Sequence, residues 1–95
     1  MARKKNSTNR KTPYRDIVFL YRRLRGRIVE KFVSQARFAR AMGMTPQMLS
    51  ARLTGRSAFT SGEVWYACKL LEIEDGKIGY YFFCIDEKEG SRNGG

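Results

Sequence analysis

The chain has 95 residues, of which 42% are hydrophobic, and it carries a net charge of +10 without a single histidine. A chain of this length forms one small domain with a modest core. The lack of histidine removes the commonest general base and the commonest metal ligand, so we expect neither an enzyme nor a metal or cofactor site. No apolar run approaches the roughly 18 residues of a membrane span. We therefore expect a cytoplasmic protein with no membrane partner.

The positive charge is concentrated in the first two thirds of the chain. Residues 1–15 contain six lysines and arginines and no acidic residue, and residues 16–56 contain nine against two acids. Residues 57–95 contain four cations against seven acids. This asymmetry favours a nucleic acid or an anionic membrane surface as partner. The alternative is a basic surface that serves only solubility.

Composition divides the chain into three parts. Residues 1–13 are predicted to be a disordered basic arm, because they lack hydrophobic periodicity. Residues 14–85 are predicted to form the folded domain, and residues 86–95 a flexible tail. The arm is a candidate for lying along a DNA groove, with a nonspecific electrostatic tail as the alternative. Its cations are Arg3, Lys4, Lys5, Arg10 and Lys11.

The first helix is predicted within residues 14–32. Apolar residues recur there at spacings of three and four, as on one face of a helix. They are Ile17, Leu20, Tyr21, Leu24, Ile28 and Phe32. Gly26 costs about 1 kcal/mol relative to alanine inside a helix. The helix can therefore begin as late as Tyr21, with residues 16–20 (DIVFL) as an extended lead-in.

Two short helices follow, separated by a tight turn. Ser34 is the predicted N-cap of the second helix, which ends near Met42. Gly43 suits the position after this helix, where a positive φ excludes most other residues. Thr45 is the predicted N-cap of the third helix. Pro46 is tolerated at its first position, since the N–H that proline lacks would have no partner there.

The remaining elements complete an all-α bundle. A capping-box spacing opens the fourth helix at residues 60–63, and Ala67, Cys68 and Leu71 continue its apolar stripe. The run at residues 78–85 (IGYYFFCI) leaves helix and strand both open, and we favour a short helical turn followed by an extended end. The predicted fold class is thus all-α, a compact bundle of four to five short helices.

The second and third helices have the spacing of a helix-turn-helix. Leu49 and Leu53 lie four residues apart and are expected to face the core, which turns Gln47 and Ala51 outward. Gln47 can pair with adenine, Ser50 can form one hydrogen bond, and Ala51 can contact a thymine methyl group. We therefore predict that this face enters the DNA major groove. The alternative is an ordinary helical hairpin with a solvated surface.

A set of spaced residues in these helices is shared with a known family. The residues are Gln35, Ala39, Gly43, Leu49, Leu53 and Gly55. They resemble the Cro/C1-type (XRE-like) helix-turn-helix family of phage repressors. Over residues 21–83, the segments LRGRIVEKF, SQARFARAMGMTPQMLSARLTG, FTSGEVWYACKLLEI and IGYYFF are similar to small Cro/CI-like regulators of phages and prophages of low-GC Gram-positive bacteria, formerly catalogued as a family of unknown function. The resemblance implies a lambda-repressor-like fold.

The resemblance also implies roles for individual side chains. Gln35, at the start of the second helix, would bond a DNA phosphate. The residues that would face the bases are Thr45, Gln47, Ser50 and Ala51. Pro46 stands where many relatives carry a polar residue, so one base contact is expected to be missing. Gly62 replaces a helix former and weakens the start of the fourth helix.

Cations and hydroxyls around the third helix are further candidates for binding phosphates. Together with Gln35, this set comprises Arg37, Arg52, Thr54, Arg56 and Ser57. The alternative is that the arginines cover apolar surface with their stems, which is the interpretation we favour for Arg40.

The prediction for function is a sequence-specific regulator of transcription that binds a double-stranded DNA operator, a phage or prophage repressor of the Cro-like kind. It would read the major groove with residues 46–53. The alternative is a protein-interaction module, an antirepressor or co-repressor that binds another regulator, with DNA binding secondary. An RNA-binding domain is disfavoured because the sequence lacks the aromatic pair of RNA-binding sheets.

The aromatic residues raise the question of a homodimer. Trp65 is expected in the core, as is most of the run Tyr80–Phe83, yet one small bundle cannot bury all of these rings. A dimer contact through the C-terminal aromatic segment is therefore a further prediction. It would suit two DNA half-sites about one turn apart.

Overall fold

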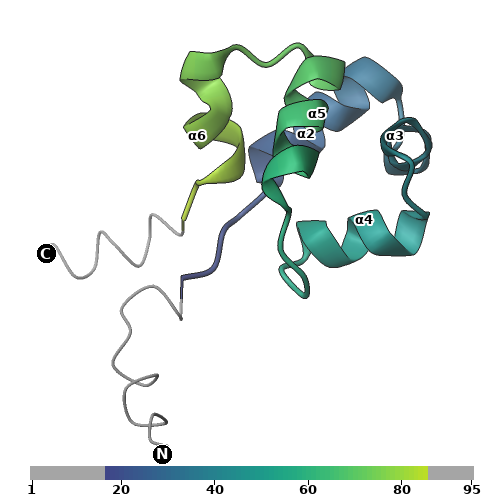
Figure 1. The fold of residues 1–95 in the computed structure, drawn as a ribbon, viewed down its shortest axis with the longest axis horizontal. Coiled ribbons are helices and arrows are strands. Elements are labelled where there is room, and N and C mark those ends of the chain that lie inside the picture. Colours follow the sequence, from purple (N-terminus) through teal and green to yellow (C-terminus); the bar gives the residue numbers. More distant parts are fainter. Residues whose placement is uncertain (1–16, 86–95) are drawn as a thin grey trace, which may run out of the picture.

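This computed structural model describes residues 17–85. They form five α-helices and one short 3₁₀ helix, joined by turns and loops. In chain order they are α2 (Arg22–Phe32), α3 (Gln35–Met42), α4 (Pro46–Leu53), α5 (Ser61–Leu71), η1 (Asp75–Lys77) and α6 (Ile78–Phe82) (Figure 1). The predicted all-α bundle is confirmed. The predicted arm at residues 1–13 and tail at residues 86–95 lie outside the described residues.

The first helix begins late, because the chain before it is paired with the end of the fold. Residues 17–20 are extended, and the Leu20 N–H donates to the Cys84 carbonyl at 2.7 Å. Phe19 forms an isolated antiparallel bridge with Ile85. Both the extended lead-in and the extended end are thus as predicted. Ile17, Leu20 and Tyr21, by contrast, precede α2 and are not part of a helical stripe. Ile17 is exposed, whereas Tyr21 packs against the core.

Local capping sets the helix boundaries as predicted. Side-chain oxygens of Ser34, Thr45 and Thr60 each accept the backbone N–H three residues further on. These bonds satisfy N–H groups that have no partner within the helix. Gly43 and Gly55 follow α3 and α4 with φ of 77° and 84°, where a Cβ would be strained.

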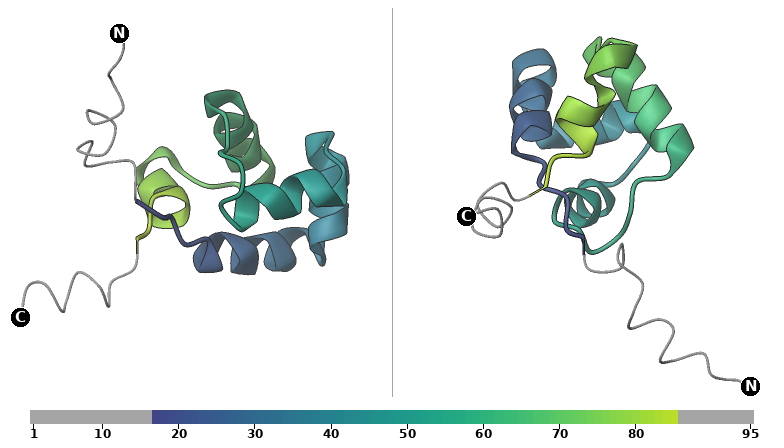
Figure 2. Two further views of the ribbon diagram at one scale, coloured as in Figure 1. Left: turned by 90° about the horizontal axis from the view of Figure 1, so that it is seen from below. Right: turned by 90° about the vertical axis from the view of Figure 1, so that its left-hand side faces the viewer.

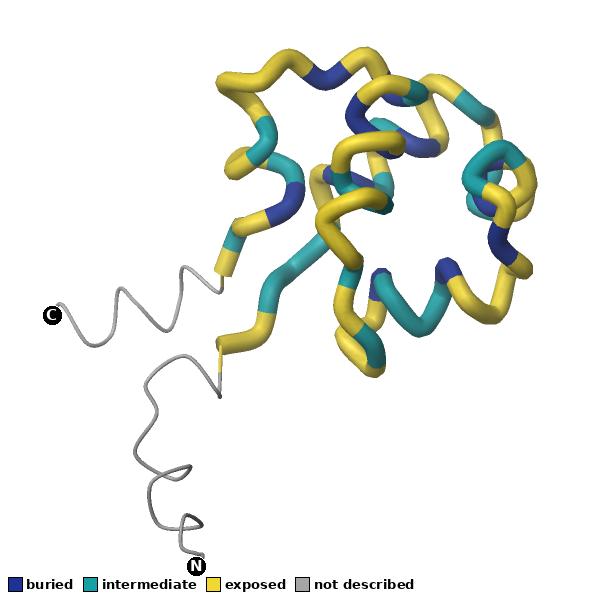
Figure 3. Tube along the Cα trace, viewed as in Figure 1, coloured by how far each residue is buried: buried dark blue, intermediate teal, exposed yellow. Residues whose placement is uncertain are grey.

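One hydrophobic core unites α2 to α6. Its buried residues are Leu24, Ile28, Phe38, Ala39, Met44, Leu49, Leu53, Ala67, Cys68, Leu71, Ile73 and Phe82. In Figure 1, α3 is viewed almost end-on and α4 lies across the bottom of the bundle, and in the left-hand view of Figure 2 α2 runs along the lower edge. Each α-helix contributes buried residues to this core (Figure 3). The buried residues of α4 are Leu49 and Leu53, which lie four apart on one side of the helix.

The aromatic residues divide between core and surface. Phe82 is buried, but Trp65 is 62% exposed, so the expectation that Trp65 lies in the core was wrong. The reason is its position on α5, where Ala67, Cys68 and Leu71 form the buried side. Tyr80 and Phe83 are also exposed, Phe83 while it packs edge-on against the Phe19 ring.

Candidate nucleic-acid interface

Helices α3 and α4 are joined by a tight turn that the backbone itself fixes. The Gly43 N–H donates to the Arg40 carbonyl at 3.0 Å, and the Met44 N–H donates to the Ala39 carbonyl at 2.8 Å. Ala39 and Met44 are both buried. The turn is therefore packed as well as hydrogen-bonded, and it holds α4 in a helix-turn-helix arrangement with α3.

Helix α4 presents one side to the core and the other to solvent. Leu49 is 0% and Leu53 4% exposed, while Gln47 is exposed, as predicted. Ser50 is half-buried. Ala51 is also half-buried, less open than expected. The following loop folds back on it, since the N–H groups of residues 56 and 57 donate to the Ala51 carbonyl at 2.9 and 3.2 Å.

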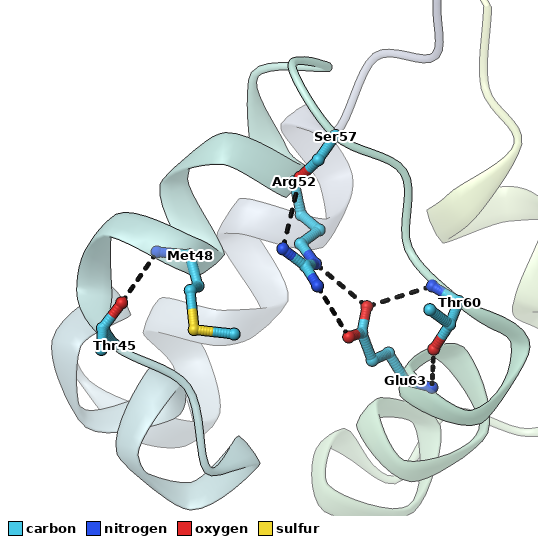
Figure 4. Close-up of polar contacts among 6 residues, drawn as sticks. All are labelled: Thr45, Met48, Arg52, Ser57, Thr60 and Glu63. Carbon is cyan, nitrogen blue, oxygen red and sulfur yellow. Dashed lines mark hydrogen bonds and ion pairs between the residues drawn. The ribbon is translucent and has the colours of Figure 1, made fainter.

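The hydroxyl of Thr45 has a structural task at the start of α4. Its oxygen accepts the Met48 N–H at 3.1 Å (Figure 4). Thr45 is exposed, as a residue facing DNA must be. Because one lone pair of the oxygen is engaged in the cap, the hydroxyl keeps its hydrogen as the donor for a further contact.

Arg52 is engaged within the protein. Its Nε and Nη2 donate to the two carboxylate oxygens of Glu63 at 3.0 and 2.9 Å, and its Nη1 donates to the Ser57 Oγ at 3.3 Å (Figure 4). The side chains of Arg52 and Glu63 are only 16% and 21% exposed. This geometry speaks against the predicted phosphate contact of Arg52, because its donor groups already have partners. The Ser57 hydroxyl only accepts from Arg52, so its hydrogen stays available as a donor.

The charges of this pair reinforce one another. The hydrogen bond to Glu63 raises the pKa of Arg52. In return, the hydrogen bond from Arg52, and then that from the Thr60 N–H, lower the pKa of Glu63 against the opposing effect of burial. Both groups are therefore ionised at neutral pH.

The other candidate phosphate ligands are more open. Arg37 is exposed on α3, while Gln35 is half-buried at its start. Arg56 is exposed after α4, and its Nε donates to the Thr54 hydroxyl at 3.4 Å. Thr54 itself donates to the Ser50 carbonyl at 2.9 Å, which closes the last turn of α4. Arg37 and Arg56 thus remain the clearest candidates for contact with a polyanion.

Most arginines of α2 bind other parts of the fold, a role that the sequence did not reveal. Arg25 donates to the Leu53 carbonyl at the end of α4 at 3.1 Å, and Arg27 donates to the Leu71 carbonyl at the end of α5 at 2.9 Å. The guanidinium of Arg23 lies 4.0 Å from the centre of the Tyr80 ring. Within residues 17–85, the arginine side chains with no hydrogen bond or ion pair to a described residue are Arg22, Arg37 and Arg40.

Neither a cluster of metal ligands nor a membrane-spanning helix is found among the described residues. No three His, Cys, Asp or Glu residues between positions 17 and 85 gather as metal ligands. Nor does any helix in that range have the length and apolar character needed to cross a bilayer.

Comparison with known proteins gives the family. The family described as "protein of unknown function (DUF739)" matches residues 17–85, the same residues that form the bundle. The chain belongs to the DUF739 family. Among curated proteins we found no match for this DUF739 chain.

A solved structure is similar to the DUF739 chain over most of its fold. It is the solution structure of the modulator of repression (MOR) of the temperate bacteriophage TP901-1 from Lactococcus lactis. The two share 34% sequence identity and superpose with a TM-score of 0.63, over 68% of this chain and 88% of that one.

Proposed function

We propose that this DUF739 protein is a phage or prophage regulator that binds operator DNA through α4 and so modulates repression. The observation that carries the proposal is the two-sidedness of α4, with Leu49 and Leu53 in the core and Gln47 open to solvent. The printed function of the similar phage protein, modulation of repression, supports a regulatory role. So does the likeness to the Cro/C1-type family in the sequence.

The proposed mechanism needs no catalytic step. Helix α4 would lie in the major groove, where the Gln47 amide can form two hydrogen bonds with adenine. Arg37 and Arg56, at either side of α4 along the chain, would neutralise phosphates and fix the register of the protein on the duplex. An occupied operator would exclude polymerase or a competing regulator from the same DNA.

The test is to select bound sequences from a random duplex pool, first with the natural protein and then with Gln47→Ala. The variant should lose about 1–3 kcal/mol of discrimination at one base pair while keeping its affinity for unselected DNA. Lys77→Ala, in η1 and away from α4, is the control and should leave the selected sequence unchanged. An equal loss on all sequences with Gln47→Ala would refute base recognition by this residue.

A second candidate function is docking onto another regulator, as an antirepressor or co-repressor. The exposed rings favour it, since Trp65, Tyr80 and Phe83 lie open on α5 and at the C-terminal end of the fold, and Trp and Tyr are enriched at protein interfaces. Co-purification with the repressor of the same phage tests it. Trp65→Ser and Phe83→Ser should abolish co-purification but leave DNA binding intact.

A further inference from the structure

A bidentate ion pair joins α4 to α5, and each of its two partners forms a further hydrogen bond. Arg52 comes from the last turn of α4, and Glu63 from the first turn of α5. Parallel hydrogen bonds of 3.0 and 2.9 Å join the guanidinium to the carboxylate. Such fork-to-fork pairs restrict orientation as well as distance. The Ser57 hydroxyl, in the loop between the helices, accepts a third bond from Arg52 at 3.3 Å.

Glu63 is held in place independently of Arg52. It is the acidic residue of the capping box, and its Oε1 accepts the Thr60 N–H at 3.0 Å (Figure 4). The Thr60 hydroxyl accepts the Glu63 N–H at 3.1 Å in return. The capping box alone thus positions the carboxylate at the start of α5. The carboxylate can therefore hold Arg52, and with it the end of α4, in a fixed position.

Other restraints also act at that end of α4, since Leu53 is buried in the core. The main packing partner of α4 among the described elements is α3. The Leu53 carbonyl accepts a hydrogen bond from Arg25 of α2. Arg52 adds a restraint from the α5 side, and we expect a change in the Arg52–Glu63 pair to alter the tilt of α4.

Transfer of Arg52 from Glu63 to a DNA phosphate would be unfavourable. It would leave Glu63, whose side chain is only 21% exposed, without its cation and next to a polyanion. Removing one partner from a largely buried pair leaves an uncompensated charge. We therefore expect the ion pair to stay intact when the protein binds DNA. Because the pair has no net charge, it neutralises no phosphate and releases no counterions from the DNA.

We propose that Arg52 is a positioning residue, which Glu63 holds in order to set the orientation of α4, and that it is not a phosphate ligand. This inference rests on the proposed function, since it assumes that α4 reads DNA. Phosphate binding then falls to open cations such as Arg37 and Arg56.

Salt dependence of DNA binding separates the two roles. The probe is a short mixed-sequence duplex, titrated with the full chain between about 50 and 200 mM salt, where each neutralised phosphate contributes about 0.9 to the slope of log K against log salt. Arg56→Gln should lower the slope by about that amount. Arg52→Gln should leave the slope unchanged but alter the sequence preference in pool selection. A fall of about 0.9 in the slope with Arg52→Gln would overturn the proposal.

Glu63→Gln tests the same idea with the arginine intact. It should change the sequence preference as Arg52→Gln does, without lowering the slope, and it guards against a poorly folded Arg52 variant. Arg52→Lys keeps the charge but lacks the fork, so it should not restore the natural preference. If Arg52→Lys restores it fully, charge alone suffices and orientation by Arg52 is refuted.

A measurement without DNA keeps this inference separate from the proposed function. If the natural protein shows no salt-dependent binding to duplex DNA, the proposed function fails. The role of the pair in orienting α4 can then be tested by comparing the backbone amide NMR chemical shifts of Glu63→Gln with those of the natural protein. Shifts along α4 as well as at the start of α5 would support positioning by the pair, whereas shifts confined to residues 60–64 would refute it.

Discussion

At the scale of single residues, Val33 is under backbone strain. It follows α2 with φ of 75° and ψ of −43°, and its side chain is 66% exposed. A β-branched residue rarely adopts positive φ, because its Cβ crowds the backbone. Strain of this kind costs about 1–3 kcal/mol. Since the side chain is largely in solvent, little packing offsets this cost.

Val33→Gly should therefore stabilise the protein. Glycine removes the strain, although its greater conformational freedom in the unfolded chain lowers the free energy of unfolding by about 0.4–1 kcal/mol. We expect a net gain of about 1 kcal/mol in the free energy of unfolding, measured by urea denaturation. Val29→Gly is the matched control, a similar valine that is 53% exposed but lies inside α2. It should lose a few tenths of a kcal/mol. Equal losses in both variants would show that Val33 is unstrained.

At the scale of helices and turns, what the sequence predicts correctly is what neighbouring residues determine. Ser34, Thr45 and Thr60 cap helices through bonds that span three residues, and Gly43 terminates α3 through its own backbone conformation. The burial of Leu49 and Leu53 likewise followed from helical periodicity. These signals require no knowledge of the tertiary structure.

The features that the sequence did not reveal are those that distant elements create. Whether Arg52 binds a phosphate or Glu63 depends on where α5 packs, and both residues look equally exposed in a helical pattern. Arg25 reaches the Leu53 carbonyl only because α2 passes the end of α4. The pairing of Leu20 with Cys84 joins the two ends of the fold. No spacing in the sequence encodes these contacts.

The cap of α4 provides a test at this scale. Thr45→Ala removes the oxygen that accepts the Met48 N–H and should lower the free energy of unfolding by about 1 kcal/mol. Thr45→Ser keeps the cap and should stay within a few tenths of the natural value. Urea denaturation without DNA measures both, so that any base contact of Thr45 does not contribute. If Thr45→Ala is as stable as Thr45→Ser, the hydroxyl does not cap α4.

At the scale of the whole molecule, three acidic residues lie at the end of the fold opposite α4. Glu72, Glu74 and Asp75 lie in and beside the connection from α5 to η1, at the top of Figure 1, while α4 lies at the bottom. The described chain starts near α4, since Ile17 and Val18 line an apolar groove of about 230 Å³ together with Gly55, Ser57 and Ala58. The first described residue, Ile17, therefore lies on the α4 side, and the six cations of residues 1–15 precede it in the sequence.

From the positive charge of residues 1–13, we predict that the arm adds affinity without adding specificity. Replacing Arg3, Lys4, Lys5, Arg10 and Lys11 together by glutamine preserves chain length and alters no residue of the described fold. The urea denaturation curve should be unchanged. The slope of log K against log salt should fall by up to about 0.9 for each phosphate that the arm contacts, and binding to all duplexes should weaken alike.

The control for the arm keeps its charge and changes its sequence. A variant with the order of residues 2–12 shuffled should bind like the natural protein if the arm acts only as a diffuse positive charge near α4. If shuffling instead changes the sequence selected from a random pool, specific arm side chains contact bases, as minor-groove arms do. Natural affinity in the five-glutamine variant would mean that the arm does not reach DNA. The open cations of the fold, Arg37 and Arg56 among them, would then account for the electrostatic part of binding.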